Sequence, residues 1–252
     1  TTNPGGVGHA WYRLRFVAPY LERRETETRF VPARVGDNAF NNPEYRRILE
    51  GLTGWQRRAW LDGDWDIAAG QFFTSFRREV HVVENFDDSR AREWFAAMDY
   101  GFAHYTVVLL GCTDGDGNVF IVDEHAERMW LPQRHAQAIR GMLGRHKTNE
   151  GCTLHLLDLK RFVAGTDVFS RQSDGTSIAA QYEKQGVKLR PANMDRINGW
   201  AEIQQRFGEA KGGAASGGVK PTLFIHKRCA RLIETLPGLQ HDPNRPEDVL
   251  KV

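Results

Sequence analysis

From about residue 73 onward, short apolar runs alternate with longer segments that mix apolar and polar residues. Residues 94–99, 105–112 and 119–123 are apolar or β-branched and predict three strands, with a hairpin turn at the Asp-, Gly- and Asn-rich residues 113–118. Further strands are expected at residues 153–159, 187–190 and 222–226, and helices at residues 131–146, 176–185, 197–207 and 228–236. The glycine-rich residues 211–220 predict a flexible loop.

The order of these elements predicts an α/β fold. Antiparallel strands come first and strands then alternate with helices, which indicates a mixed sheet flanked by helices on its faces. A ribonuclease H-like core has this order of elements. We therefore expect one ribonuclease H-like domain at residues 73–252.

Residues 1–72 have a different character, because they are rich in Arg, Trp and Pro and show little strand alternation. Residues 45–52 predict a short helix that ends at a glycine, and residues 54–61 predict a second. This part is too small and too polar to form a core of its own. We interpret it as an adaptor or as the end of another domain.

Composition excludes several classes of protein. The 34 Lys and Arg residues are balanced by 32 Asp and Glu residues, so any basic nucleic-acid surface has to be local. No run of about 18 uncharged apolar residues is long enough to span a membrane. The three cysteines are dispersed, which argues for reduced thiols in a cytosol-like compartment and against a disulfide framework or a zinc finger.

Asp99 is the first candidate for chemistry, because it ends an apolar strand just before a Tyr-Gly pair. Open α/β sheets bind ligands at the carboxyl ends of their strands, although an aspartate here could also cap a turn. A second carboxylate should come from a neighbouring strand. Asp158, at the end of the strand predicted at 153–159, and Asp167, after residues 162–166, are both available. Asp158 could instead pair with a neighbouring cation, and Asp167 could be an N-cap.

Carboxylates from separate strands repel one another unless a cation lies between them. Oxygen ligands favour Mg²⁺ or Mn²⁺, and two such ions can promote hydrolysis of a phosphodiester. Asp114 and Asp116 resemble the start of a calcium loop, but Val119 stands in place of the required glycine, so we prefer a hairpin turn. Asp123 and Glu124 could supply a further acidic group, and we prefer a capping role for them.

Cationic side chains near predicted strand ends and helix starts are candidates for contact with DNA phosphates. Those we favour are Lys160, Arg161, Arg171, Arg196 and Arg228. Arg77, Arg78, Arg190, Lys227 and Arg231 are placed similarly. For each of them singly, an ordinary solvated surface is the alternative.

Several segments, in order, resemble those of phage terminase large subunits, the DNA-packaging motors. TTNPGG at residues 1–6 resembles the motif that ends the ATPase core, and FVPARVGDN at 30–38 and WLDGDWD at 60–66 resemble the linker before the nuclease. MDYG at 98–101 is similar to the first catalytic strand, and GTDVFSR at 165–171 to the second aspartate segment. DRINGW at 195–200 and HDPNRPEDV at 241–249 also fit.

The resemblance implies a C-terminal ribonuclease H-like nuclease domain, preceded at residues 1–72 by the end of the ATPase domain and the linker. It implies an endonuclease that cuts concatemeric double-stranded viral DNA during packaging, with two Mg²⁺ or Mn²⁺ ions. Asp99 and Asp167 would be metal ligands, with Asp158 as the alternative second. The implied partners are double-stranded DNA, the portal protein, the small terminase subunit and further copies in a ring, in the host bacterial cytoplasm and transiently at the procapsid portal.

Two departures from the family pattern qualify these expectations. The phosphate loop and the acidic ATPase motif would precede Thr1, so no ATPase activity is expected of this stretch. A third acidic ligand would follow the PED segment, in a helix beyond Val252. The rival hypotheses are another ribonuclease H-like nuclease, of the resolvase or transposase type, and a non-catalytic DNA-binding or motor-docking module.

Overall fold

The structure is a computed structural model that describes residues 4, 9–51, 59–65, 71–173, 175–208, 219–242 and 245–250. The chain folds into two compact units, one of residues 1–76 with 234–252 and one of residues 77–233. The second predicted helix at 54–61 lies mostly outside the described residues. The same holds for residues 211–218 of the predicted loop, for the TTNPGG motif except Pro4, and for residues 66 and 243–244 of the other matched segments.

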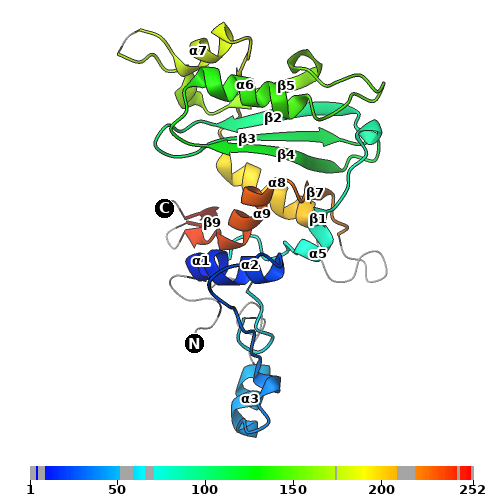
Figure 1. The fold of residues 1–252 in the computed structure, drawn as a ribbon, viewed down its shortest axis with the longest axis vertical. Coiled ribbons are helices and arrows are strands. Elements are labelled where there is room, and N and C mark those ends of the chain that lie inside the picture. Colours follow the sequence, from blue (N-terminus) through cyan, green and yellow to red (C-terminus); the bar gives the residue numbers. More distant parts are fainter. Residues whose placement is uncertain are drawn as a thin grey trace. The chain divides into compact units, whose positions relative to one another are not determined.

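The larger unit is built on a seven-stranded sheet (Figure 1). Its strands lie in the order β1 (Val82–Val83), β7 (Leu223–His226), β4 (Val119–Glu127), β3 (Thr106–Thr113), β2 (Glu93–Asp99), β5 (Leu159–Ala164) and β6 (Arg190–Pro191). All neighbouring pairs are parallel except those that β3 makes with β2 and β4. The predicted mixed sheet is therefore confirmed, and the carboxyl ends of six strands face one edge.

Helices cover both faces of this sheet (Figure 1). On one side lie α6 (Pro132–Leu143) and α7 (Ile178–Lys184), and on the other lie α8 (Arg196–Phe207) and the start of α9 (Ala230–Thr235). The short α5 (Arg78–His81) leads into β1. Helices α6, α7 and α8 begin within two residues of their predicted starts. Helix α6 begins with a proline in its first turn, and the side chains of Ser177 and Asp195 cap the starts of α7 and α8.

The core lies between the sheet and the α6–α7 layer. Trp94, Ala96 and Met98 of β2 are buried there, while the alternate residues Ala97 and Asp99 are exposed. Because neighbouring strand residues point to opposite faces, burying Met98 turns the side chain of Asp99 to the other face. The packing of β2 thus fixes where its terminal carboxylate lies.

One strand differs from its prediction. The strand expected at 153–159 is instead β5, which begins at Leu159, and residues Leu156–Asp158 form the 3₁₀ turn η4. The apolar residues at 154–157 suggested a buried strand, but Leu157 is 97% exposed. Lys160 and Arg161 lie within the strand with exposed side chains, and Phe162 and Ala164 provide its buried face. Likewise, the predicted strand at 187–190 is reduced to β6 at the sheet edge, where a proline is tolerated.

A half-buried histidine of β4, His125, contacts a buried histidine of α6, His135. His125 Nε2 and His135 Nδ1 lie 2.8 Å apart. Burial lowers the pKa of His135 to about 4, helped by His125 and Arg134 and opposed by Glu127, and burial together with Arg145 lowers the pKa of His125. Both rings are therefore held neutral in the folded protein at pH values at which a solvated histidine is protonated.

This pair predicts that the protein loses stability as the pH falls. The folded pKa of His135 lies below the unfolded value near 6.5, so its contribution is complete above pH 6.5 and declines as the pH falls towards about 4. At pH 5 the loss from His135 is expected to reach about 2 kcal/mol. Urea unfolding at pH 7.5 and pH 5 measures it. The His135→Gln variant should show a shallower pH dependence, and identical slopes for the two proteins would contradict this explanation.

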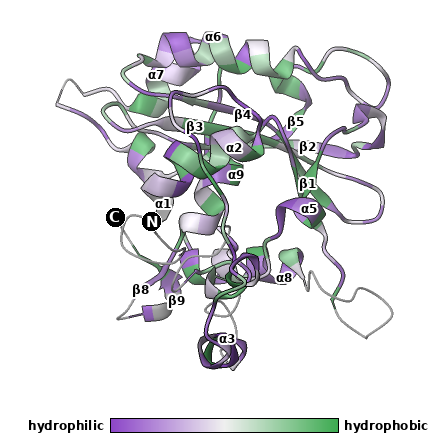
Figure 2. Ribbon diagram, turned by 60° about the horizontal axis from the view of Figure 1, so that its bottom comes forward, coloured by the Kyte–Doolittle hydropathy of each residue, from purple (hydrophilic) through white to green (hydrophobic). Residues whose placement is uncertain are grey.

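The smaller unit contains a helical segment at residues 9–21 that was not predicted from the sequence. It runs through α1 (His9–Tyr12), a π-helical turn (Arg13–Val17) and α2 (Ala18–Leu21). The first predicted helix is confirmed as α3 (Pro43–Glu50), with Asn42 as its N-cap and Gly51 as its C-cap. Figure 2 shows α3 mostly in the hydrophilic colour, and Leu49 is its buried residue.

The C-terminal segment completes the apolar interior of the smaller unit. Phe72 and Phe73 are buried, and the backbone N–H of Phe72 donates to the carbonyl of Leu239 at 2.7 Å. The segment ends in a small hairpin of β8 (His241–Asp242) and β9 (Arg245–Val249). The sequence predicts that residues 1–72 lack a core of their own. In the structure, the C-terminal segment from residue 234 onward contributes to the core of this unit. No helix among the described residues is long and apolar enough to cross a membrane.

Candidate functional site

Asp99 lies at the carboxyl end of β2, an inner strand between β3 and β5. The chain turns sharply behind it, because a side chain at Gly101 would come within 2.9 Å of the carbonyl oxygen of Tyr105. The hydroxyl of Thr106 donates to the carbonyl of Gly101 at 2.7 Å and holds this turn closed. The carboxylate is thus carried at the rim of the sheet on a fixed backbone.

Asp167 reaches the same rim from β5. This strand runs parallel to β2, and Ala164 pairs with Met98, so both strands end at the same level. Asp167 follows in the 3₁₀ turn η5 (Thr166–Phe169), which the buried Val168 anchors in the core. A Cβ atom at Gly165 would lie only 2.5 Å from Asp167 Oδ1, so glycine leaves the space that this carboxylate occupies.

The two carboxylates influence each other electrostatically. Partial burial raises the pKa of Asp99, and the negative charge of Asp167 raises it further. Asp99 remains accessible to water while surrounding protein atoms partly desolvate it. Two like charges held in this way are relieved by a proton or by a cation, and oxygen-only ligands suit Mg²⁺ or Mn²⁺. Within the described ranges, no group of three or more Asp, Glu, His or Cys side chains is placed to hold a metal ion.

Asp158, the alternative second ligand, lies at the opposite end of the sheet. It ends η4 just before β5, and the next residue, Leu159, pairs with Trp94 near the start of β2. The length of β2, on the order of 15–20 Å at about 3.3 Å per residue, separates that end from Asp99. Its carboxylate accepts a hydrogen bond from the backbone N–H of His155 at 2.7 Å. The structure brings Asp99 and Asp167 together and leaves Asp158 apart from both.

Solved structures of phage large terminases are similar to this chain. The large terminase from a thermophilic bacteriophage, in complex with ATP-γ-S, matches 99% of this chain and 57% of its own, with a TM-score of 0.55 and 15% sequence identity. The P22 large terminase nuclease domain matches 73% of this chain and 84% of its own, with a TM-score of 0.52 and 12% identity. The chain has the fold of a phage large-terminase nuclease domain.

This terminase nuclease fold is the predicted ribonuclease H-like α/β fold, which is thereby confirmed. The chain spans little more than half the length of the large terminase from the thermophilic bacteriophage. No family model matches its sequence, and no curated protein shows significant sequence similarity to it.

The predicted DNA-contacting cations are spread over the terminase nuclease fold. Arg171 and Arg196 follow the carboxyl ends of β5 and β6, the edge that carries Asp99. Arg161 is exposed in β5. Lys160 forms an ion pair with Glu93 near the opposite edge, and Arg228 lies 3.6 Å from the carboxylate of Asp123. Of this set, Arg171 and Arg196 therefore follow strands that end at the same end of the sheet as Asp99 and Asp167.

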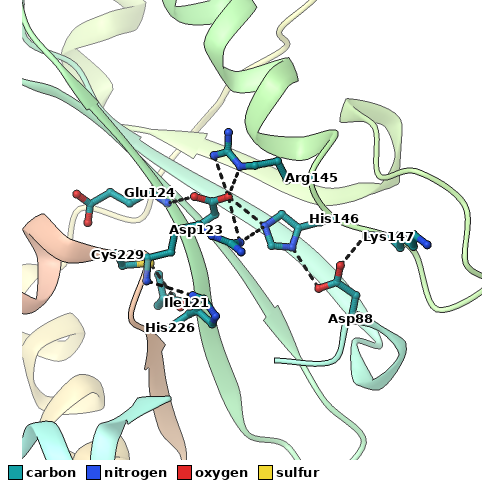
Figure 3. A network of polar contacts seen from close by, with 10 residues as sticks. Asp88, Ile121, Asp123, Glu124, Arg145, His146, Lys147, His226 and Cys229 are labelled. Atoms are coloured by element: carbon teal, nitrogen blue, oxygen red, sulfur yellow. Dashed lines mark hydrogen bonds and ion pairs between the residues drawn. The ribbon is translucent and has the colours of Figure 1, made fainter. Parts of the chain in front are cut away.

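Asp123 has a different role from the predicted cap. It lies within β4, which continues to Glu127, and its side chain is only 1% exposed. Its Oδ2 atom accepts a hydrogen bond from Arg145 Nε at 3.0 Å and lies 3.1 Å from His146 Nε2 (Figure 3). The other ring nitrogen of His146 is 3.1 Å from Asp88 Oδ1. Capping does apply to Glu124, whose carboxylate accepts from the backbone N–H of Leu232 in α9 at 2.8 Å.

The charge of Asp123 is stabilised inside the protein. Burial raises its pKa, but hydrogen bonds from His146 and the backbone of Glu124, with Arg145, outweigh burial and leave the pKa below its ordinary value. An aspartate inside an apolar strand is a signal from which a buried charge at Asp123 could have been predicted. Its partners could not be predicted, because they come from distant segments. The predicted hairpin turn at residues 113–118 is confirmed, and Asp114 accepts from the backbone N–H groups of Asp116 and Asn118 within it.

Gly165 provides a prediction about the geometry of the site. Its backbone conformation is open to alanine, so Gly165→Ala should fold normally, but the new methyl group would displace the Asp167 carboxylate. We expect the melting temperature to stay within about 2 °C of wild type. The metal-dependent DNA cleavage that the resemblance to terminases implies should fall by about 10-fold or more. Gly141→Ala is the matched control, because a methyl group there meets no neighbouring atom. Gly175 is unsuitable as a control, because its positive φ would strain an alanine. Equal cleavage by both variants would contradict the assigned position of Asp167.

Proposed function

We propose that this chain is the nuclease part of a phage large terminase, a metal-dependent endonuclease that cuts concatemeric double-stranded DNA during genome packaging. The observation that carries the proposal is the pair Asp99 and Asp167. They follow the carboxyl ends of adjacent parallel strands in a terminase nuclease fold, and the charge of Asp167 raises the pKa of Asp99.

The donor set fits divalent cations with oxygen ligands. Asp99 and Asp167 would hold two Mg²⁺ or Mn²⁺ ions, and both carboxylates are accessible from solvent. When bound, such ions supply an activated water and stabilise the leaving oxygen of a phosphodiester. The chain itself supplies one carboxylate from the end of β2 and the other from the turn after β5. Glycine at position 165 leaves room for the Asp167 carboxylate. Arg171 and Arg196 would contact DNA phosphates at this edge.

The remaining parts of the proposal concern the whole packaging machine. The larger protein would work with the portal protein and the small terminase subunit, as a ring of identical subunits. It would act in the host bacterial cytoplasm and transiently at the procapsid portal. These partners rest on the similarity to large terminases across the chain.

Cleavage of supercoiled plasmid DNA tests the activity. We expect nicked and linear products with Mn²⁺ or Mg²⁺, none with EDTA, and recovery when Mn²⁺ is restored. Binding of the same plasmid is measured in parallel by gel shift in EDTA. DNA binding without cleavage at any metal concentration would favour a non-catalytic module, and cleavage in EDTA would exclude a metal-dependent mechanism.

A further inference from the structure

Two arginines lie near one tyrosine ring next to the candidate site. The guanidinium carbon of Arg231 lies 3.7 Å from the centroid of the Tyr105 ring, and that of Arg128 lies 5.6 Å from it. Tyr105 directly precedes β3, Arg128 directly follows β4, and Arg231 lies in α9, so the fold and not the local sequence brings them together. We call them the Arg–Tyr–Arg cluster.

The sheet register places this cluster beside Asp99. Asp99 pairs with Val107 of β3, and Val107 pairs with Ala126 of β4. Two residues further towards the same edge are Tyr105 and Arg128, and a shift of two residues keeps a side chain on the same face. Tyr105 also abuts the turn behind Asp99, because its carbonyl oxygen closes the space at Gly101.

Arg231 approaches the same face from α9. The neighbouring residue Leu232 donates its backbone N–H to the carboxylate of Glu124 at 2.8 Å. Glu124 pairs with Leu109, and Leu109 pairs with Ala97, which shares the face of Asp99. The cluster therefore lies at the same edge and on the same face of the sheet as Asp99.

The chemistry of the cluster suits an anionic polymer. A guanidinium stacked on an aromatic ring is held in one orientation, and its planar N–H edge can bind phosphate oxygens with two hydrogen bonds. Arg128 is exposed and Tyr105 is half-buried. The charges of Asp99 and Asp167 repel an approaching DNA backbone, and cations at the flank offset this repulsion.

We propose that Tyr105, Arg128 and Arg231 form a phosphate-binding site that holds the DNA backbone next to the Asp99–Asp167 pair. This inference rests on the proposed nuclease function and identifies how that site receives its substrate. Two phosphate contacts each contribute about 0.9 to the slope of log K against log salt concentration, so losing both lowers the slope by about 1.8.

Equilibrium binding of a short fluorescein-labelled DNA duplex in EDTA, over a series of NaCl concentrations, tests the proposal. The double variant Arg128→Ala/Arg231→Ala should bind at least about 10-fold more weakly, with the reduced salt slope. Arg134→Ala is the matched control, because Arg134 lies 3.7 Å above the Trp130 ring but belongs to α6, on the other face. Wild-type affinity and slope in the double variant, or an equal loss in the control, would overturn the proposal.

Two further variants keep the result interpretable. Arg128→Ala alone changes an exposed side chain and should still lower the slope by about 0.9. The double Arg→Lys variant keeps both charges and should recover part of the affinity. If the cluster is not the phosphate site but the nuclease proposal holds, the double alanine variant cuts plasmid normally while Asp99→Asn does not. If the nuclease proposal fails, wild type does not cut, and the binding measurement still decides on the cluster.

Discussion

The Asp99→Asn and Asp167→Asn variants are expected to lose metal-dependent DNA cleavage while keeping their fold. Asparagine preserves the shape of each side chain but removes the negative charge that a divalent cation requires. Loss of a group that merely supports a metal ligand costs up to about 100-fold, so loss of a ligand itself should exceed about 100-fold. Plasmid cleavage in Mn²⁺ and in Mg²⁺ measures the effect.

The melting temperatures of the two variants distinguish a role in metal binding from a structural role. Each substitution removes one of two mutually repelling charges, so the melting temperature in EDTA should stay constant or rise. Asp158→Asn is the matched control, because Asp158 is an exposed aspartate in a turn next to the same strand β5, at the opposite end. The assignment is wrong if Asp99→Asn cuts like wild type, or if Asp158→Asn loses as much activity.

The Asp123→Ala variant is expected to show the largest loss of stability. Removing this carboxylate leaves Arg145, the buried His146 and Arg228 without the negative charge that they share. The side chains of Arg145 and Arg228 are about half exposed and stay solvated, so the loss is that of hydrogen bonds to a buried charge, about 1.5–3 kcal/mol. For a protein of this size we expect the melting temperature to fall by roughly 5–10 °C. Thermal unfolding followed by circular dichroism measures the change.

Glu93→Ala is the comparison for Asp123→Ala. Glu93 also pairs with a cation, Lys160, but both side chains are about half exposed. Exposed ion pairs contribute about 0–1 kcal/mol, so this variant should unfold within a few degrees of wild type. Similar losses in the two variants would mean that burial of Asp123 does not determine the strength of its network.

The strands that are apolar throughout could be predicted from the sequence, and those with a polar face could not. Residues 94–99 and 105–112 appear as strands because both faces of β2 and β3 accept apolar side chains along most of their length. β5 was displaced by several residues because Lys160 and Arg161 occupy its exposed face. The two-residue strand β1 carries no pattern of its own and exists through its pairing with β7.

The candidate site was predicted in part, for a similar reason. The position of Asp99 follows from its place at the end of an apolar strand. The choice between Asp158 and Asp167 depended on where β5 begins and ends, and the sequence pattern placed that strand too early. Because β5 ends at Ala164, Asp167 lies at the same end of the sheet as Asp99. Asp158 precedes β5 and lies at the opposite end.

Contacts between distant segments were beyond reach of sequence patterns. Asp123 meets Arg145 and His146 because α6 returns over β4, and Tyr105 meets Arg128 and Arg231 because three elements converge at one edge. Neither group has a characteristic spacing along the chain. The packing of helices against the sheet defines both.

Anomalous diffraction from crystals soaked in Mn²⁺ tests the central claim most directly. We predict anomalous density within coordination distance of a carboxylate oxygen of Asp99 and one of Asp167, and its loss in crystals of Asp99→Asn. Manganese bound elsewhere with both carboxylates unliganded, or density that persists between these strand ends in the Asp99→Asn protein, would contradict the account.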